Sequence, residues 1–399
     1  MVWPVAKVYL FILLGLMISL VLGARTTSLG EMPDWSELDR FQKSITHQEF
    51  KVALETVYCP RPEWWAPWIR LELDRAKIRK ASGSEDWYEL IFSPEEENAS
   101  HARTVLSPQS LDGMVIGLDP GHIGGEWSEM ERRHFSLDQD QPVKEGDLSL
   151  AVARELMPAL QKLGAKPVLV RSAAEPVTKR RPEDFRKDAL AWAGQSGIED
   201  SNDSSVQEHL IQERQELLFY RVDEIHARAD LINHSIRPDL VVCIHFNAAP
   251  WPDSDSHELV ERNDHHVLVN GCYLGGELAY DDQRFELILR MVNRWHIPEQ
   301  GLAESLASSF SKNAGLVAFS YKGPNALKIG EVPGVWARNL LANRKYRCPV
   351  VFLEPYVANS LAVYPRIQNW LQGKRGGDDC LIKEYASAVL LGLKNHFTP

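Results

Sequence analysis

Cysteine is scarce in this sequence, and the patterns that paired cysteines form are missing. The 399 residues contain five cysteines, and no two of them form a CxxC pair. Their scattered positions exclude a disulfide framework, and the odd count leaves at least one thiol free. Cys243 lies inside an apolar stretch and is expected to be a small core residue. One disulfide is possible in an exported protein, but the sequence does not show which cysteines would form it.

The sequence also lacks an excess of basic residues. Lys and Arg number 44 against 55 Asp and Glu, which gives a formal net charge of −11 at pH 7. Binding to nucleic-acid phosphates needs clustered Lys and Arg, so this balance argues against nucleic acid as the main partner. Hydrophobic residues make up 44% and charged residues 25%, which is an ordinary globular composition. The length is sufficient for two domains with real cores.

The N-terminus differs from the rest of the chain. Residues 1–24 carry one charge, Lys7, followed by the apolar run 8–24, in which only Ser19 is clearly polar. A short basic start, an apolar stretch and the small residues Gly23-Ala24 predict a signal peptide. The apolar run has 17 residues, the lower limit of a membrane span, so an uncleaved N-terminal anchor is the alternative. Either reading predicts an exported protein of the periplasm or cell envelope.

An N-terminal segment of unknown role follows over residues 25–107. Apolar residues recur at helical spacing over 34–58, residues 87–92 are typical of a short strand, and the acidic, polar stretch 94–107 is typical of a linker. The segment is therefore predicted to be helical or α+β. It also contains an aromatic cluster, which core packing explains better than a glycan-stacking surface. The cluster consists of Trp64, Trp65 and Trp68.

From residue 113 onward, apolar strands alternate with amphipathic helices. This order predicts an α/β domain over 111–399, with a mostly parallel twisted sheet flanked by helices. The expected strands are 115–118, 167–170, 240–246, 266–273 and 350–353, and the expected helices are 148–163, 206–234, 285–295, 301–313 and 383–396. The polar stretch 173–207 interrupts the order, and we interpret it as an insertion that forms a lid, a binding loop or a disordered segment.

Ionisable side chains stand at the ends of three expected strands. His122 follows the first strand through a tight turn, His245 ends another, and Glu354 follows the last one. Glu145 begins the first expected helix of the domain. Each residue alone has an ordinary structural explanation. Glu145, for example, could be a carboxylate at a helix start that the helix dipole stabilises. Together they predict a zinc site with two His and one carboxylate, and a second carboxylate as general base.

At these positions the chain resembles the zinc-dependent N-acetylmuramoyl-L-alanine amidases. The resembling segments, in chain order, are Asp119–Gly125 (DPGHIGG), Lys144–Ala151, Gly164-Ala165 with Pro167–Arg171, Arg228–Asp230 with Pro238–Ala248, and Val350–Glu354. The resemblance covers roughly residues 113–396. It implies that His122, Glu145 and His245 bind zinc and that Glu354 is catalytic.

The resemblance also implies a substrate. This is the amide bond between N-acetylmuramic acid and L-alanine, in peptidoglycan or muropeptides, with Asn247 as a substrate-binding residue. A zinc peptidase acting on stem peptides needs the same chemistry and is the alternative, as is a non-catalytic protein that binds the cell wall. The sequence identifies no activator protein.

The sequence departs from the family pattern in two places near the site. His122 and Glu145 are 23 positions apart, wider than usual, which predicts an enlarged active-site loop over 126–142. After Glu354 the family commonly has Gly-Phe before its Asn, where this chain has Pro355–Asn359.

Other ionisable residues are given structural explanations. His257, His265 and His266 are interpreted as surface loop residues, with a role in the substrate groove as the alternative. Glu213 and Glu216 are interpreted as a solvated helix face rather than as caps on the zinc.

Overall fold

The computed structural model describes residues 32–94, 110–198, 204–251, 258–374 and 380–397. The predicted signal peptide or anchor, most of the predicted linker and His257 lie outside these residues. Within them, no helix is both long enough and apolar enough to cross a membrane.

The N-terminal residues form a small layer of helices and strands. Its helices are η1 (Trp35–Phe41), α2 (His47–Ala53), η2 (Leu54–Tyr58) and α3 (Pro62–Trp65). The strands β1 (Ile69–Leu71), β2 (Arg75–Arg79) and β3 (Trp87–Ile91) form an antiparallel sheet. The layer is therefore α+β. Helix α2 begins where the side chain of Thr46 accepts from the Glu49 N–H and Glu49 accepts from the Thr46 N–H, a reciprocal cap.

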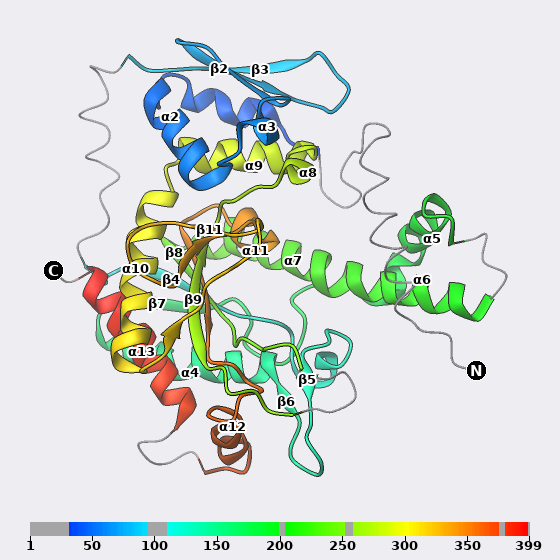
Figure 1. Cartoon of the computed structure of the whole chain (residues 1–399), viewed down its shortest axis with the longest axis vertical. Helices are drawn as coiled ribbons and strands as arrows, with labels where there is room; N and C mark the ends of the chain where they lie inside the picture. The colour runs from blue at the N-terminus through cyan, green and yellow to red at the C-terminus, as the bar shows by residue number, and fades with distance from the viewer. Residues whose placement is uncertain (1–31, 95–109, 199–203, 252–257, 375–379, 398–399) are drawn as a thin grey trace.

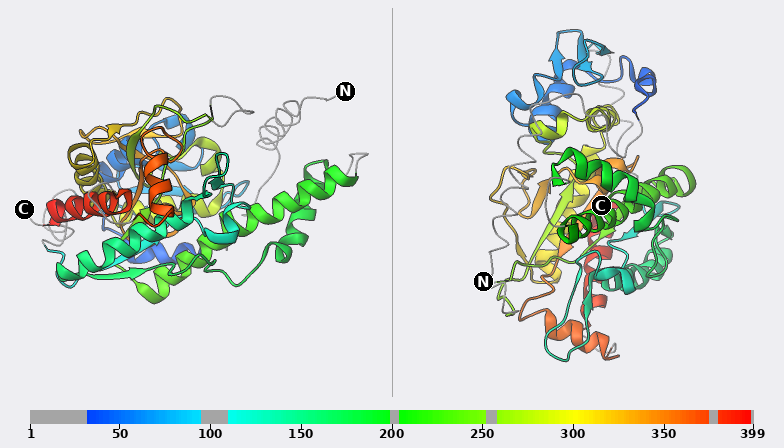
Figure 2. Two further views of the ribbon diagram at one scale, coloured as in Figure 1. Left: turned by 90° about the horizontal axis from the view of Figure 1, so that it is seen from below. Right: turned by 90° about the vertical axis from the view of Figure 1, so that its right-hand side faces the viewer.

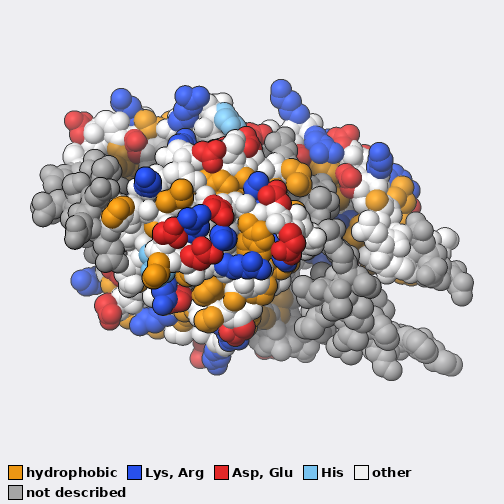
Figure 3. All heavy atoms as spheres, turned by 90° about the horizontal axis from the view of Figure 1, so that it is seen from above, with side chains coloured by type: hydrophobic (Ala, Val, Ile, Leu, Met, Phe, Trp, Pro, Cys, Tyr) orange, Lys and Arg blue, Asp and Glu red, His pale blue; other side chains and the backbone are white. Residues whose placement is uncertain are grey.

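This layer lies on α8 (Gly275–Leu278) and α9 (Asp281–Val292), at the top of Figure 1. The backbone N–H groups of Cys272 and Tyr273 donate to the carbonyls of Val57 and Tyr58. The tryptophan cluster is partly buried against the main core. Because one hydrophobic core spans both sides of residue 107, the boundary between 25–107 and 111–399 stays a prediction. The outer face of the molecule, seen from above, mixes basic and acidic side chains (Figure 3).

In the described residues, the main sheet has eight strands in the order β11-β12-β9-β13-β8-β4-β7, with β10 added beside β9. The strands β4, β7, β8 and β13 are parallel to one another, whereas β9 is antiparallel to β13. The bounds are β4 (Val115–Pro120), β7 (Lys166–Leu169), β8 (Leu240–Ile244), β9 (Asp264–Val269), β10 (Val317–Ala318), β11 (Leu327–Lys328), β12 (Val335–Ala337) and β13 (Val350–Pro355). The predicted α/β fold with a mostly parallel sheet is confirmed.

Helices cover both faces of this sheet (Figure 1). One face packs on α4 (Glu145–Lys162), α10 (His296–Asn313) and α13 (Leu381–Phe397). The other face packs on α7 (Glu224–Asp230) and α11 (Leu341–Lys345), and we call it the α7 face. The central strands are apolar on both sides because both faces are buried. The short helix α12 (Tyr364–Leu371) lies near the lower end of the molecule in Figure 1.

The stretch that was expected to be an irregular insertion is largely helical. It contains η4 (Pro182–Phe185) and α5 (Arg186–Gln195), and α6 (Ser204–Leu218) continues through η6 (Phe219–Asp223) and α7 into η7 (Leu231–Ile236). Helices α5 and α6 pack as a hairpin around Ala189, Ala193 and Ile211. Figure 1 and Figure 2 show α6 and α7 as one long rod, in which α7 lies against the body and α6 extends away from it. The small core of this hairpin explains why the sequence shows no strong apolar pattern there.

Candidate metal centre

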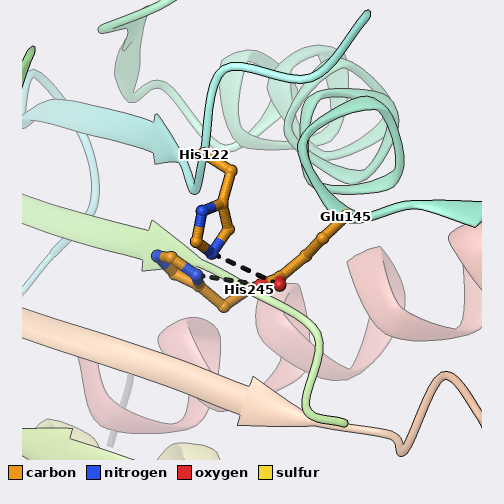
Figure 4. A group of neighbouring side chains, drawn as sticks. All are labelled: His122, Glu145 and His245. Atoms are coloured by element: carbon orange, nitrogen blue, oxygen red, sulfur yellow. Dashed lines mark hydrogen bonds and ion pairs between the residues drawn. The ribbon is translucent and has the colours of Figure 1, made fainter. Parts of the chain in front are cut away.

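Three potential metal ligands converge at the carboxyl ends of β4 and β8. His122 lies in the loop after β4, Glu145 is the first residue of α4, and His245 follows β8 directly. The Nε2 atom of His122 lies 3.3 Å from one carboxylate oxygen of Glu145, and Nδ1 of His245 lies 3.0 Å from the other (Figure 4). One ligand atom from each residue fits within 4.8 Å of the others. This spacing suits a single metal ion.

The close approach of the two histidines depends on a glycine. Strands β4 and β8 are parallel neighbours, with Pro120 opposite Ile244, so the residues that follow them leave the sheet side by side. A Cβ atom on Gly121 would lie 2.2 Å from Cε1 of the His245 ring. His122 itself has a φ of 58°, a left-handed conformation that is strained for a residue with a side chain. The turn at Gly121 and His122 therefore brings the His122 ring next to the His245 ring.

A second close approach fixes Glu145 relative to His122. A Cβ atom on Gly146 would lie 2.4 Å from the backbone nitrogen of Gly124, so only glycine allows α4 to begin against this loop. The Asp147 carboxylate accepts a hydrogen bond of 2.8 Å from the N–H of Gly125. The loop and the helix start thus behave as one unit that carries two of the three ligands.

Sequence reasoning missed Glu131, which belongs to the site. Its carboxylate accepts hydrogen bonds from the N–H groups of Ile123 and Gly124 at 2.9–3.2 Å, and it lies 3.5 Å from Nδ1 of His122. A carboxylate on one ring nitrogen orients a metal-binding histidine and fixes which nitrogen faces the metal. The signal that could have found it is an acid in the loop 126–142, between the two ligand-bearing segments.

The charges of the site shift its pKa values in opposite directions. Burial acts to lower the pKa of His122, but the carboxylates of Glu145 and Glu131 outweigh it and raise that pKa to about 9. Burial acts to raise the pKa of Glu145, and the two histidines outweigh it and hold that pKa well below its usual value. The pKa of His245 is lowered, because burial exceeds the attraction of Glu145. The site is built around a carboxylate that stays ionised.

Two buried arginines hold the backbone that carries the ligands. Arg228 donates to the Asp119 carboxylate at 2.8 Å, and also to the carbonyls of Pro120 and His122. Arg171 donates to the carbonyl of Gly146 at 2.9 Å and to that of Gly121 at 3.4 Å. These residues lie in segments that resemble the amidase motifs, but their positioning role is visible only in the structure.

Glu354 lies in β13 and lines the same cavity as His122 and His245. The cavity has a volume of about 710 Å³ and lies on the α7 face of the sheet. Burial and the negative charge of Glu145 raise the pKa of Glu354 to about 8. The ring of Phe352, two residues earlier on the same strand, stacks on His245 at 4.1 Å. Glu354 is thus a carboxyl group beside the ligand cluster rather than one of its members.

Asn247 faces a second, smaller cavity. Its side chain carbonyl accepts from the N–H of Ala248 at 2.9 Å, and its amide lies 3.4 Å from Asp264. The cavity, of about 130 Å³, is also lined by Glu145, Phe135 and Trp251. The predicted substrate role of Asn247 remains a prediction.

The interpretation of His265 and His266 as surface loop residues is wrong. They are 0% and 3% exposed, because β9 begins at Asp264 and places both inside the sheet. His265 bonds to the hydroxyl of Ser311 at 2.8 Å, and His266 bonds to that of Tyr321 at 3.0 Å.

Glu213 and Glu216 do not form a simple solvated face either. Both are half-buried and line the large cavity, where Glu213 pairs with Arg132.

Comparison with known proteins gives structural likenesses only. No family model matches the chain, and no curated protein matches it. A solved amidase from Clostridioides difficile, in complex with a lipoprotein, has a TM-score of 0.41 and 13% identity, covering 71% of this chain and 98% of that one. An N-acetylmuramyl-L-alanine amidase from Mycobacterium smegmatis has a TM-score of 0.41 and 15% identity, covering 72% of this chain and 98% of that one.

A third likeness is to the catalytic domain of an N-acetylmuramoyl-L-alanine amidase from Paenibacillus polymyxa. Its TM-score is 0.37 and its identity 14%, and the match covers 71% of this chain and 97% of that one. At these identities and TM-scores, such likenesses carry no argument about activity.

Proposed function

We propose that the chain is a zinc-dependent hydrolase that cleaves the amide bond between N-acetylmuramic acid and L-alanine in peptidoglycan. One observation carries the proposal: ligand atoms of His122, Glu145 and His245 lie within 4.8 Å of one another, and Glu354 lines the same cavity. The choice of substrate comes from the ordered segments that resemble this amidase family.

The residues present fit zinc. Two imidazole nitrogens and one carboxylate form a common catalytic zinc set, which leaves a fourth position for water. Glu131, on the far nitrogen of His122, supplies the outer carboxylate that such sites usually have. When bound, zinc would lower the pKa of water towards ~7, polarise the amide carbonyl, and add positive charge that opposes the raised pKa of Glu354.

Glu354 has the position and environment of a general acid and base. In this proposal its carboxylate takes a proton from the attacking water and delivers it to the nitrogen that leaves as L-alanine's amino group. Its neighbours Phe352 and Leu268 are apolar, which limits competing solvation of the carboxylate. The strained turn at His122 and the glycine contacts hold the ligands in place before substrate arrives.

The proposal extends to location and substrate form. An enzyme of this kind acts outside the cytoplasm, on the polymer or on muropeptide fragments, which agrees with the predicted N-terminal signal peptide or anchor. That segment lies outside the described residues, so the export of the chain is a separate proposal. It is checked by sequencing the N-terminus of the mature protein.

The variant Glu354→Gln tests the central role. We expect zinc content to stay unchanged and peptide release from purified peptidoglycan to fall ~10²–10⁴-fold, the usual contribution of a positioned acid–base group. Glu37→Gln is the control, because Glu37 pairs with Arg347 at the surface, away from the cavity. A Glu354→Gln protein with full activity would contradict the assignment. Released peptides that lack a free N-terminal alanine would instead indicate a zinc peptidase.

A further inference from the structure

We infer that Arg338 binds a carboxylate on the peptide part of the substrate, inside the cavity lined by His122, His245 and Glu354. The inference rests on the proposed function, because it specifies which part of that substrate occupies the cavity. It assigns the peptide to the side of the site that faces β12.

Arg338 stands on the same face of the sheet as the catalytic groups. Trp336 pairs with Leu268 in the register of β12 and β9, and both belong to the core of the α7 face. Arg338 comes two residues after Trp336, so its side chain is directed to that same face. It lines the cavity of about 710 Å³ together with His122, His245 and Glu354.

Arg338 is a half-buried arginine of this cavity whose charge has no acidic partner among the described residues. The buried Arg228 pairs with Asp119 and Glu224, and the exposed Arg132 and Arg133 pair with Glu213 and Glu145. Arg221 also lines the cavity but is exposed to water. In the described part of the chain, no carboxylate lies within ion-pair distance of Arg338, although its charge acts to lower the pKa of Glu354.

A row of side chains holds Arg338 in place. Its guanidinium donates to the hydroxyl of Tyr321 at 3.4 Å, and that hydroxyl bonds to Nε2 of His266 at 3.0 Å. His266 lies directly opposite Glu354 in the antiparallel register of β9 and β13, so their side chains share one face. The row of Arg338, Tyr321 and His266 therefore runs alongside the catalytic carboxyl group.

The cavity wall makes an unpaired charge costly. Leu268, Phe352 and Leu340 contribute apolar surface beside Arg338. A charged group in such surroundings is stabilised when an opposite charge joins it, and a guanidinium fork matches a carboxylate with two parallel hydrogen bonds. Binding of an anion from the substrate would therefore stabilise the charge of Arg338, because the described residues supply no carboxylate to it.

The proposed substrate supplies that anion on one side of the scissile bond. The acid of the muramoyl group is consumed in the amide, whereas a peptide joined through its amino group still ends in a carboxylate. A peptide carboxylate is therefore the group that Arg338 would bind.

The test uses two synthetic muramoyl peptides that differ only in a free carboxylate or a carboxamide. With zinc-loaded enzyme, we expect Arg338→Gln to raise KM for the acid by ~10- to 100-fold, as for loss of a charged hydrogen bond, with a smaller change in kcat. KM for the carboxamide should change less than ~3-fold. Arg338→Lys should fall between, because it keeps the charge and loses the fork. Arg347→Gln removes the same charge at the surface and is the control.

Equal effects of Arg338→Gln on both substrates would overturn the inference, as would an unchanged KM for the acid. A second measurement separates this inference from the proposed function. Calorimetry with the Glu354→Gln protein reports binding without turnover. A preference for the acid that disappears in the Arg338→Gln, Glu354→Gln double variant supports the inference even if wild-type protein cleaves neither compound. Equal affinity for acid and amide overturns it.

Discussion

Two pairs of histidines lie at the same edge of the main sheet, and their surroundings differ. His122 and His245, after β4 and β8, both contact the Glu145 carboxylate. His265 and His266, at the start of β9, bond to neutral hydroxyl groups. The residue type is the same in the two pairs, but His122 and His245 are partly exposed whereas His265 and His266 are buried. The Glu145 carboxylate, which contacts the first pair only, makes that pair part of a ligand set. The second pair belongs to the core.

The same difference is visible in the titration of the two pairs. Carboxylates raise the pKa of His122 to about 9 despite its burial. Burial without an ion-paired acid lowers the pKa of His265 to about 4 and that of His266 to about 3. The β9 histidines are therefore neutral at physiological pH, and nothing in their described surroundings completes a ligand set for either.

The largest predicted effect separates the pairs by metal content. His245→Ala should reduce bound zinc from one ion per chain to a small fraction and abolish peptide release, because zinc bound by the two remaining ligands is far weaker. His266→Gln should keep its zinc. Metal analysis of the dialysed proteins by mass spectrometry measures both. Zinc loss in His266→Gln, with the fold intact by circular dichroism, would erase the distinction between the pairs.

A smaller effect is expected from Glu131, which orients His122 without reaching the metal. Glu131→Gln should weaken zinc binding by ~10- to 100-fold, since outer-shell carboxylates contribute on this scale. Competition with a chelator gives the dissociation constant. Asp140→Asn is a matched control in the same loop, because Asp140 accepts from the Tyr364 hydroxyl and is remote from His122. An unchanged constant in Glu131→Gln would remove this residue from the site.

The buried histidine His266 should make the fold sensitive to acid. Its folded pKa of about 3 lies below the value of 6.5 for an exposed histidine, so the unfolded chain binds more protons between these pH values. Stability from this group is present above pH ~6.5 and is lost as pH falls towards 3. Because one proton corresponds to about 1.4 kcal/mol per pH unit, His266→Gln should flatten the pH slope of the unfolding free energy by up to that amount.

Urea unfolding of the metal-free proteins between pH 4.5 and 7 provides the measurement. Wild-type and variant share the empty ligand cluster, so the difference between their slopes isolates His266. Parallel slopes would mean that His266 is protonated or accessible to water in the native protein.

The sequence predicted some of this arrangement for a physical reason. Alternating strands and helices imply parallel neighbours, and residues that follow parallel strands leave the sheet at one edge. That placed His122 and His245 together, with Glu354 on the next strand. The close approach of Glu145 to these histidines depends on the tertiary contact of Gly124 with Gly146. No local sequence pattern predicts such a contact.

The misreading of β9 has a physical cause. The strand is antiparallel to β13, so its first residues, rather than its last, lie at the metal edge. Its polar opening, Asp264 to His266, resembles a loop in the sequence, although Arg262 pairs with Asp264 and a hydroxyl group bonds to Nε2 of each histidine. Glu131 and the positioning role of Arg228 were missed for a related reason, since both side chains bind backbone groups of the turn after β4, which no local sequence pattern connects to them.

The smallest predicted effect tests whether His265 is purely structural. Ser311→Ala removes the hydroxyl that bonds to Nε2 of His265 and should lower the unfolding free energy by about 1 kcal/mol, with zinc content and turnover unchanged. Alanine also favours helix α10, so the cost must be measured against Ser308→Ala in the same helix, which is expected to be neutral or slightly stabilising. Urea midpoints of the two variants give the difference. A loss of zinc or activity in Ser311→Ala alone would show that the β9 histidines are coupled to the metal centre.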